Sequence, residues 1–267
     1  MSATASGAEL LAAVEQSPRA VAAHDRAAWV GLFTDRALVE DPVGSRPHIG
    51  TAAIERFYDT FIAPNAITFR VDHDVICPMG VFRDLTIEIA MSTGVTLRVP
   101  MHLRYDLERI DGELKIAELH AHWELPVMVS QLLRAGLPGL GAAATLGPRL
   151  FANQGVGGTL GFARGFVRVG AAGRRVATEL LAASGRGSVA AVRNAVLPGA
   201  VLEWPVGNPV TADEFVARGA GVRVSKVISA GRFVTATVET AAGRGIAELE
   251  VAVGGRHIVA ARIHLAD

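Results

Sequence analysis

The spacing of apolar residues predicts helices at the beginning of the chain. Residues 51–62 carry apolar side chains three and four positions apart, as expected for an amphipathic helix, at Ile54, Phe57, Tyr58 and Phe61. Residues 8–16 and 18–34 are also predicted to be helical. Ser17 and Pro18 have the residue types typical of an N-cap and a first helical position, so we expect the second of these helices to begin there.

Strand-like segments dominate the following sixty residues. After a short strand at 37–40, four segments with strand character follow at about 67–77, 81–93, 95–109 and 113–123. The dipeptide Asp111-Gly112 between the last two is typical of a tight hairpin turn. Helices followed by a run of antiparallel strands predict an α+β fold, with the helices on one face of a curved sheet.

The same order of elements returns in the second half of the chain. Predicted helices at 174–183 and 188–195 precede Val201–Asn208, which repeats the Glu, Pro, Val and Gly of Leu38–Ser45 in the same positions. A predicted helix at 211–218 comes next, and four predicted strands follow at about 221–229, 232–241, 244–253 and 256–265. We infer an internal duplication, in which Trp204 stands at the position of Asp41.

Between the two copies the composition changes. Residues 125–172 contain many Gly, Ala and Leu and few charged side chains, which is typical of a linker or lid. We therefore expect three parts: a first domain at 1–124, this linker or lid at 125–172, and a second, degenerate domain at 173–267. The many apolar side chains of the middle part should pack over the first domain or between the domains.

Charge and composition exclude several classes of protein. The 26 Lys and Arg balance the 26 Asp and Glu, so the chain lacks the basic surplus typical of a nucleic-acid-binding protein. The single cysteine, Cys77, has no partner for an internal disulfide. The N-terminus lacks the pattern of a secretory signal, and no apolar run reaches the roughly 18 residues of a membrane helix. We expect a cytoplasmic protein without an integral membrane segment.

One segment carries a family resemblance. The stretch from Val39 to Tyr58, with its Glu-Asp-Pro-Val-Gly sequence, resembles the part of bacterial ketosteroid isomerases that holds the general base, and the resemblance extends from about Ala20 to Trp123. These enzymes belong to the NTF2-like (SnoaL-like) superfamily. The resemblance implies two NTF2-like domains with a cystatin-like cone, the second of them degenerate. It also implies that Asp41 is the catalytic base.

The resemblance assigns further roles. The family's neutral aspartic acid, which donates a hydrogen bond to the developing enolate, falls on Asp106. The family's tyrosine donor falls on Ser17, whose hydroxyl is too short for the role and is expected to cap a helix. Tyr58 matches a supporting tyrosine and becomes the expected third catalytic residue. The substrate-binding residues are expected to be Phe57, His102, Arg104, His122 and Trp123.

The residues themselves support a base at Asp41. An aspartate at the end of a strand, followed by Pro42 and Gly44, can project into the cone, and an apolar surrounding would raise its pKa and make it a stronger base. The alternative is an aspartate that only caps a turn. Along residues 101–108, His102, Arg104, Asp106 and Glu108 share one face of the predicted strand, whereas Met101, Leu103, Tyr105 and Leu107 share the other.

Three functions remain open. The first is an isomerase that transfers a proton on a hydrophobic carbonyl compound such as a steroid. The second is an epoxide hydrolase of the limonene or polyether type, which Arg104 and Asp106 resemble. The third is a non-catalytic protein that binds a hydrophobic small molecule. We expect no cofactor and no metal, because the spacing of His102, His120 and His122 is generic.

The second domain is expected to be a silent copy that serves as a built-in dimer partner. Trp204 cannot accept a proton, and its bulk should fill the second cone. The first domain should offer the partner an apolar outer sheet face, made of Leu85, Ile87, Ile89, Met91, Leu103, Tyr105 and Leu107. This predicts an intramolecular pseudo-dimer and leaves further homo-oligomerisation open.

Overall fold

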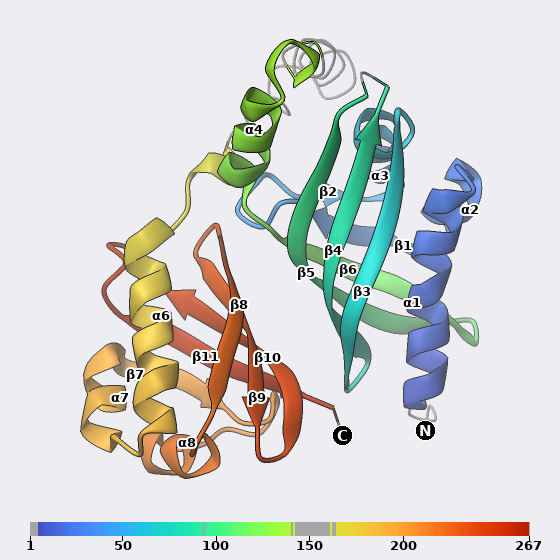
Figure 1. The fold of residues 1–267 in the computed structure, drawn as a ribbon. Coiled ribbons are helices and arrows are strands. Elements are labelled where there is room, and N and C mark those ends of the chain that lie inside the picture. Colours follow the sequence, from blue (N-terminus) through green and yellow to red (C-terminus); the bar gives the residue numbers. More distant parts are fainter. Residues whose placement is uncertain (1–4, 93, 140, 142–160, 162–163, 267) are drawn as a thin grey trace. The chain divides into compact units, whose positions relative to one another are not determined.

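The computed structural model describes residues 5–92, 94–139, 141, 161 and 164–266. It divides the chain into two compact units, one formed by residues 1–74 and 78–166 and the other by 75–77 and 167–267. Each unit combines helices with one sheet, so the α+β class is confirmed (Figure 1). None of the described helices is long and apolar enough to cross a bilayer.

The first unit contains a six-stranded sheet with the order β2-β1-β6-β5-β4-β3. Its helices are α1 (Gly7–Ala22), α2 (Arg26–Gly31), α3 (Thr51–Phe57), the π-helical turn η1 (Tyr58–Ile62), α4 (Leu125–Arg134) and the 3₁₀ turn η2 (Arg164–Phe166). Its strands are β1 (Phe33–Glu40), β2 (His48–Ile49), β3 (Asn65–Cys77), β4 (Gly80–Met91), β5 (Thr96–Ile110) and β6 (Glu113–His122).

Helix α1 is longer than the sequence suggests. Its N-cap is Ser6, which forms a capping box with Glu9: the Ser6 hydroxyl accepts from the Glu9 N–H, and the Glu9 carboxylate accepts from the Ser6 N–H. The helix then continues through Ser17 and Pro18, so the expected helix start at these residues is wrong. An internal proline costs about 3 kcal/mol. Several buried apolar side chains, each worth about 1.5–3 kcal/mol, outweigh that cost, among them Leu10, Val14 and Val21.

The sheet register determines which residues meet in the first unit. Strand β1 runs parallel to β6, and β4, β5 and β6 are antiparallel neighbours. The expected hairpin between β5 and β6 is confirmed, since Ile110 pairs with Glu113 around Asp111 and Gly112, both at positive φ. The β5–β6 register shifts after Asp106, where β6 has one extra residue.

The described residues of the glycine-rich middle segment divide between the two units: those up to Phe166 belong to the first unit, and those from Val167 onward belong to the second. The Gln131 amide of α4 donates to the Arg98 carbonyl oxygen at 2.8 Å, and the Arg98 N–H donates to Gln131 Oε1 at 3.0 Å. Met128 and Leu132 of α4 are buried, whereas Leu133 and Leu137 are exposed. Residues 140, 142–160 and 162–163 of the segment lie outside the described residues.

The described helices and strands of the second unit follow in the same order as those of the first, without counterparts of β2 and η1. Its sheet has the order β7-β11-β10-β9-β8, in which β7 is parallel to β11 as β1 is to β6. Trp204 is buried at the end of β7, and its ring packs edge-on against Phe215 with centroids 5.0 Å apart. The elements are α6 (Gly170–Gly185), α7 (Val189–Ala195), β7 (Val196–Glu203), α8 (Ala212–Arg218), β8 (Arg223–Ala230), β9 (Phe233–Thr240), β10 (Gly243–Val251) and β11 (Ile258–Leu265).

Candidate functional site

A cavity of about 140 Å³ lies in the first unit between the helices and the sheet. Strands β3, β4 and β5 contribute mostly aliphatic side chains to its wall, and α4 adds Met128 and Leu132. The polar exceptions in the wall are Ser17, Asp41, Asn65 and the polar atoms of the tyrosine and tryptophan side chains. A dry apolar cavity of about 150 Å³ holds one benzene-sized ring, so this cavity fits at least one ring of an apolar ligand.

Asp41 enters this cavity from the turn after β1. The Val43 N–H donates to the Ala121 carbonyl oxygen of β6 at 2.9 Å, and the Gly44 N–H donates to Glu40 Oε1 at 2.8 Å. Gly44 has a φ of 93°, a conformation that a residue with a Cβ rarely adopts. The turn is therefore attached to the sheet at a fixed position, and Asp41 lines the cavity as the sequence suggests.

Trp123 determines the orientation of the Asp41 carboxylate. The Trp123 indole N–H donates to Asp41 Oδ1 at 2.6 Å. Among the described residues, none donates to the second oxygen, Oδ2. Burial raises the pKa of Asp41 to about 6, and the hydrogen bond from Trp123 acts in the opposite direction. The carboxylate is thus mostly ionised at neutral pH and more basic than an aspartate in water.

Aromatic side chains form the helical wall of the cavity. Phe57 and Trp123 line it, as the sequence suggests. Phe57 is stacked against Trp29, with ring centroids 6.1 Å apart. Tyr58 is buried and packs against Trp29 at 5.6 Å, but it is not part of the cavity wall. The expected position of Tyr58 in the pocket is therefore not observed.

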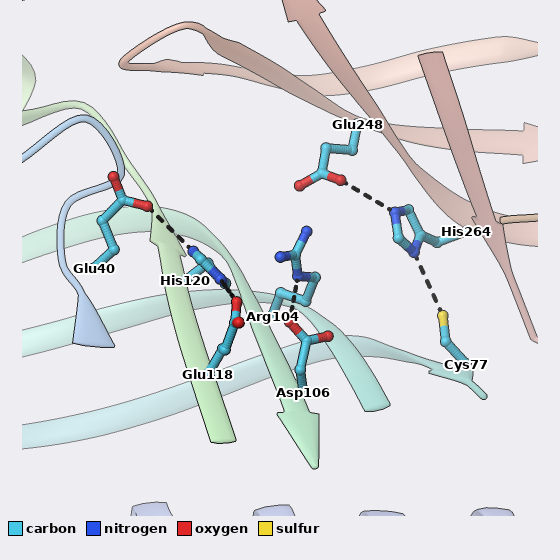
Figure 2. A network of polar contacts seen from close by, with 8 residues as sticks. All are labelled: Glu40, Cys77, Arg104, Asp106, Glu118, His120, Glu248 and His264. Carbon is cyan, nitrogen blue, oxygen red and sulfur yellow. Dashed lines mark hydrogen bonds and ion pairs between the residues drawn. The ribbon is translucent and has the colours of Figure 1, made fainter. Parts of the chain in front are cut away.

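Asp106 and Arg104 lie on the face of β5 opposite to the cavity, which corrects the expectation for both. The Arg104 Nε donates to Asp106 Oδ2 at 3.0 Å on this outer face (Figure 2). The residues that alternate with them, Leu103 and Tyr105, line the cavity instead. The count back from Trp123 without a gap crosses the extra residue of β6, and a shift of one position along a strand changes the face on which a side chain lies.

The expectation that His102 and His122 bind the substrate is also corrected. They pair with each other across β5 and β6, and neither lines the cavity. Both lie on the face of the sheet opposite to the cavity, so neither imidazole reaches a ligand there.

The outer face carries a second polar cluster around His120. Its Nδ1 lies 3.2 Å from Glu40 Oε2 and its Nε2 lies 2.7 Å from Glu118 Oε2 (Figure 2). One ligand atom each from Asp106, Glu118 and His120 lies within 4.8 Å of the others. These groups are already paired with one another or with Arg104, whose positive charge opposes a bound cation.

The expected apolar outer face of the first sheet is also corrected. Ile87, Ile89, Met91, Leu103 and Tyr105 line the cavity, where the sequence analysis placed them on the outside. The reason is again the period of two along a strand, which assigns each set of alternate residues to one face but does not say which face is inside. The expectation of a pseudo-dimer rested on this assignment.

Two hydroxyl-bearing side chains of the cavity wall, those of Ser17 and Tyr105, were not expected there from the sequence. Ser17 does not cap a helix; it is buried, and its Oγ accepts a hydrogen bond from the Trp29 indole N–H at 3.1 Å. Tyr105 belongs to the apolar face of β5 and carries a hydroxyl into the cavity wall. The alternating pattern of β5 contains this signal, because a tyrosine among aliphatic residues of the inner face must place its hydroxyl in the interior.

Comparisons with known proteins show what the first unit is similar to. Residues 14–119 match the sequence profile of the SnoaL-like domain. A Mycobacterium tuberculosis protein crystallised with estradiol-17β-hemisuccinate is 28% identical, with 44% of this chain and 95% of that chain covered and a TM-score of 0.41. A Δ5-3-ketosteroid isomerase from Mycobacterium sp. has the same identity, coverage and TM-score. An M. tuberculosis LEH-like epoxide hydrolase is 17% identical over 52% of this chain and 96% of that chain, with a TM-score of 0.42.

Proposed function

We propose that the SnoaL-like domain of residues 14–119 is a proton-transfer isomerase for a hydrophobic carbonyl compound, with Asp41 as its general base. The observation that carries the proposal is the Asp41 carboxylate in a mostly apolar cavity: one of its oxygens accepts a hydrogen bond from Trp123, and no described residue donates to the other. A carboxylate in this setting can remove a proton from a carbon next to a carbonyl group.

The proposed reaction is a shift of a double bond. Asp41 Oδ2 takes the proton from the carbon between the carbonyl group and the double bond of a β,γ-unsaturated ketone, and the C–H electron pair forms a dienolate. The protonated Asp41 then returns the same proton to the γ-carbon, so that the double bond moves into conjugation. The Asp41 carboxyl group is ionised again at the end of the reaction, and no cofactor is consumed. A pKa near 6 suits both steps at neutral pH.

The position of the other charged residues disfavours the epoxide hydrolase. An epoxide hydrolase of the type considered above activates water with an Arg side chain and a second carboxylate, both beside the reacting carbon. Arg104 and Asp106 lie on the opposite face of β5, and Asp41 is the one carboxylate among the described residues of the cavity wall. The isomerase needs one carboxylate, which the cavity provides.

The test is an absorbance assay with a β,γ-unsaturated 3-ketosteroid and with a single-ring β,γ-unsaturated ketone. Conversion to the conjugated ketone, detected as a rise in ultraviolet absorbance above the uncatalysed rate, supports the proposal. Binding of both compounds without conversion would contradict it and would identify the domain as a non-catalytic binder.

The pKa of Asp41 leads to a prediction for the pH dependence. Because the base must be ionised, kcat/KM should rise with pH through a midpoint near 6. The Trp123→Phe substitution removes the hydrogen bond that lowers this pKa, so the midpoint should move to higher pH. The pH profile of kcat/KM measures this directly.

Trp29→Phe is the matched control for this experiment. Trp29 also lines the cavity, but its indole N–H donates to Ser17 and not to Asp41. Its substitution should leave the midpoint near 6 even if the rate changes. A shift of the midpoint to lower pH in Trp123→Phe would contradict the assigned role of Trp123. An equal shift in Trp123→Phe and Trp29→Phe would contradict it as well.

A further inference from the structure

Two glycines of the middle segment contact the turn that carries Asp41. At the end of this turn, the Arg46 N–H donates to the Gly161 carbonyl oxygen at 3.1 Å. Near its beginning, Pro42 packs against Gly165, which is buried in η2. We call Gly161 and Gly165 the strap glycines. They belong to the first unit, as the turn does, so these contacts lie within one compact part of the chain.

The contacts of the strap glycines leave no room for a side chain. A Cβ at position 165 would lie 2.8 Å from Pro42 Cγ and 3.2 Å from Leu125 Cδ2. A Cβ at position 161 would lie 2.6 Å from Arg46 Cβ. Carbon atoms in contact normally keep about 3.5–4.0 Å. Neither glycine has a positive φ, so these contacts require their small size and not their backbone freedom.

The sheet and the strap glycines hold the turn at different residues. Val43 is hydrogen-bonded to β6, whereas Pro42 and Arg46 contact the strap glycines. Because Pro42 directly follows Asp41, a displacement of Pro42 also moves the backbone of the base. The Trp123 indole N–H reaches Asp41 Oδ1 at 2.6 Å, and such hydrogen bonds weaken beyond about 3.2 Å. A small displacement of the turn is therefore enough to weaken this hydrogen bond.

We infer that the strap glycines are positioning residues, which keep the Asp41 carboxylate within hydrogen-bonding distance of Trp123. The inference rests on the proposed function and gives the middle segment a role in it. The match to the SnoaL-like domain ends at residue 119, so the strap glycines lie outside the matched part of the chain. The base thus depends on residues from beyond the domain match. A misplacement of about 1 Å in a catalytic group can cost roughly 10²-fold in rate.

The experiment replaces Gly165 by alanine in the full chain. Leu125 lies on the other side of the added methyl group, so we expect Pro42 to move and the hydrogen bond between Trp123 and Asp41 to lengthen. Since this hydrogen bond lowers the pKa of Asp41, that pKa should rise by about 0.5–1 pH unit. NMR titration of the Asp41 carboxyl carbon, assigned with the help of Asp41→Asn, measures the pKa without any substrate.

Gly31→Ala is the matched control for the added methyl group. Gly31, the last residue of α2, has open space at the position of a Cβ and no positive φ. Its substitution should leave the pKa of Asp41 unchanged. The second control is Gly165→Ala in the Trp123→Phe background, where the hydrogen bond is already absent and the pKa should rise no further. Burial raises the pKa of Tyr105, the other titratable side chain among the described wall residues, to about 12, so its titration does not overlap.

Ligand binding and turnover show whether the effect is confined to the base. Gly165 is not part of the cavity wall, so Gly165→Ala should leave the affinity for naphthalene, an apolar probe of the cavity, unchanged. It should lower kcat for the β,γ-unsaturated ketone about tenfold. Thermal unfolding is measured alongside. If Gly165→Ala does not fold, Gly161→Ala replaces it; by displacing Arg46, this variant should raise the pKa of Asp41 by a smaller amount.

The titration separates the inference from the proposed function. If the wild-type chain does not turn over the ketone but Gly165→Ala raises the pKa of Asp41 only where Trp123 is present, the positioning role is supported and the proposed reaction is wrong. An unchanged pKa in a folded Gly165→Ala protein would overturn the inference. An equal rise in Gly31→Ala, or in the Trp123→Phe background, would overturn it as well.

Discussion

The Asp41→Asn substitution should lower the turnover of a β,γ-unsaturated ketone by roughly 10²–10⁴-fold. The amide has nearly the shape of the carboxylate, and its oxygen can still accept the hydrogen bond from the Trp123 indole. It cannot accept a proton from carbon, so the chemical step loses its base. The loss should therefore appear in kcat, measured from initial absorbance rates, while the affinity for naphthalene stays the same.

Asp106→Asn is the control for this prediction. Asp106 forms an ion pair with Arg104 on the outer face of β5 and does not line the cavity. Its substitution should leave turnover nearly unchanged, although the family resemblance assigns it a catalytic role. A large loss in Asp106→Asn together with a small loss in Asp41→Asn would refute the site described above.

The Arg83→Met substitution should destabilise the first unit by about 3–5 kcal/mol. Arg83 of β4 is 1% exposed, donates from Nε to Asp74 Oδ1 at 2.7 Å and pairs with Glu15 of α1. Burial lowers the pKa of Arg83, but the two carboxylates more than offset this, so its pKa is raised and it stays charged. Methionine would leave Asp74 partly buried without its counter-charge.

Arg70→Met provides the comparison on the neighbouring strand. Arg70 pairs with Glu88, but its side chain is 65% exposed, and such a pair contributes about 0–1 kcal/mol. Hydrogen exchange of the β4 and β5 amides reports the free energy of opening of the first unit in both variants. Equal and small losses in the two variants would show that the ion pair around Arg83 does not hold α1 on the sheet.

The strands of the first unit could be predicted, but their faces could not. The alternation along residues 95–109 correctly separates two sets of side chains. The apolar set faces the helices, whereas the count back from Trp123 along the family resemblance placed the polar set there; the extra residue of β6 at Ala117 is seen only in the strand pairing. The assignment of Asp106 to the cavity failed for this reason, whereas Asp41 did not depend on it.

The helix boundary at Ser17 shows a different limit. Ser-Pro is a good local signal for a helix start, and local preference alone would place it there. The burial of one continuous apolar face of α1 overrides that preference, and as a consequence Ser17 lies in the cavity wall instead of at a helix end. The turn at Asp41 was predictable because Pro42 and Gly44 determine it locally.

The alternation along β5 also has an evolutionary consequence. Leu97, Val99, Met101 and Leu103 shape the cavity, whereas the residues between them point to the other face of the sheet. Mutations in the first set change which ligand fits, and mutations in the second set change the surface, so the two properties can diverge separately. Ligand preference in this scaffold can therefore drift through single substitutions at alternate positions of one strand. A small combinatorial library restricted to those positions would explore that drift.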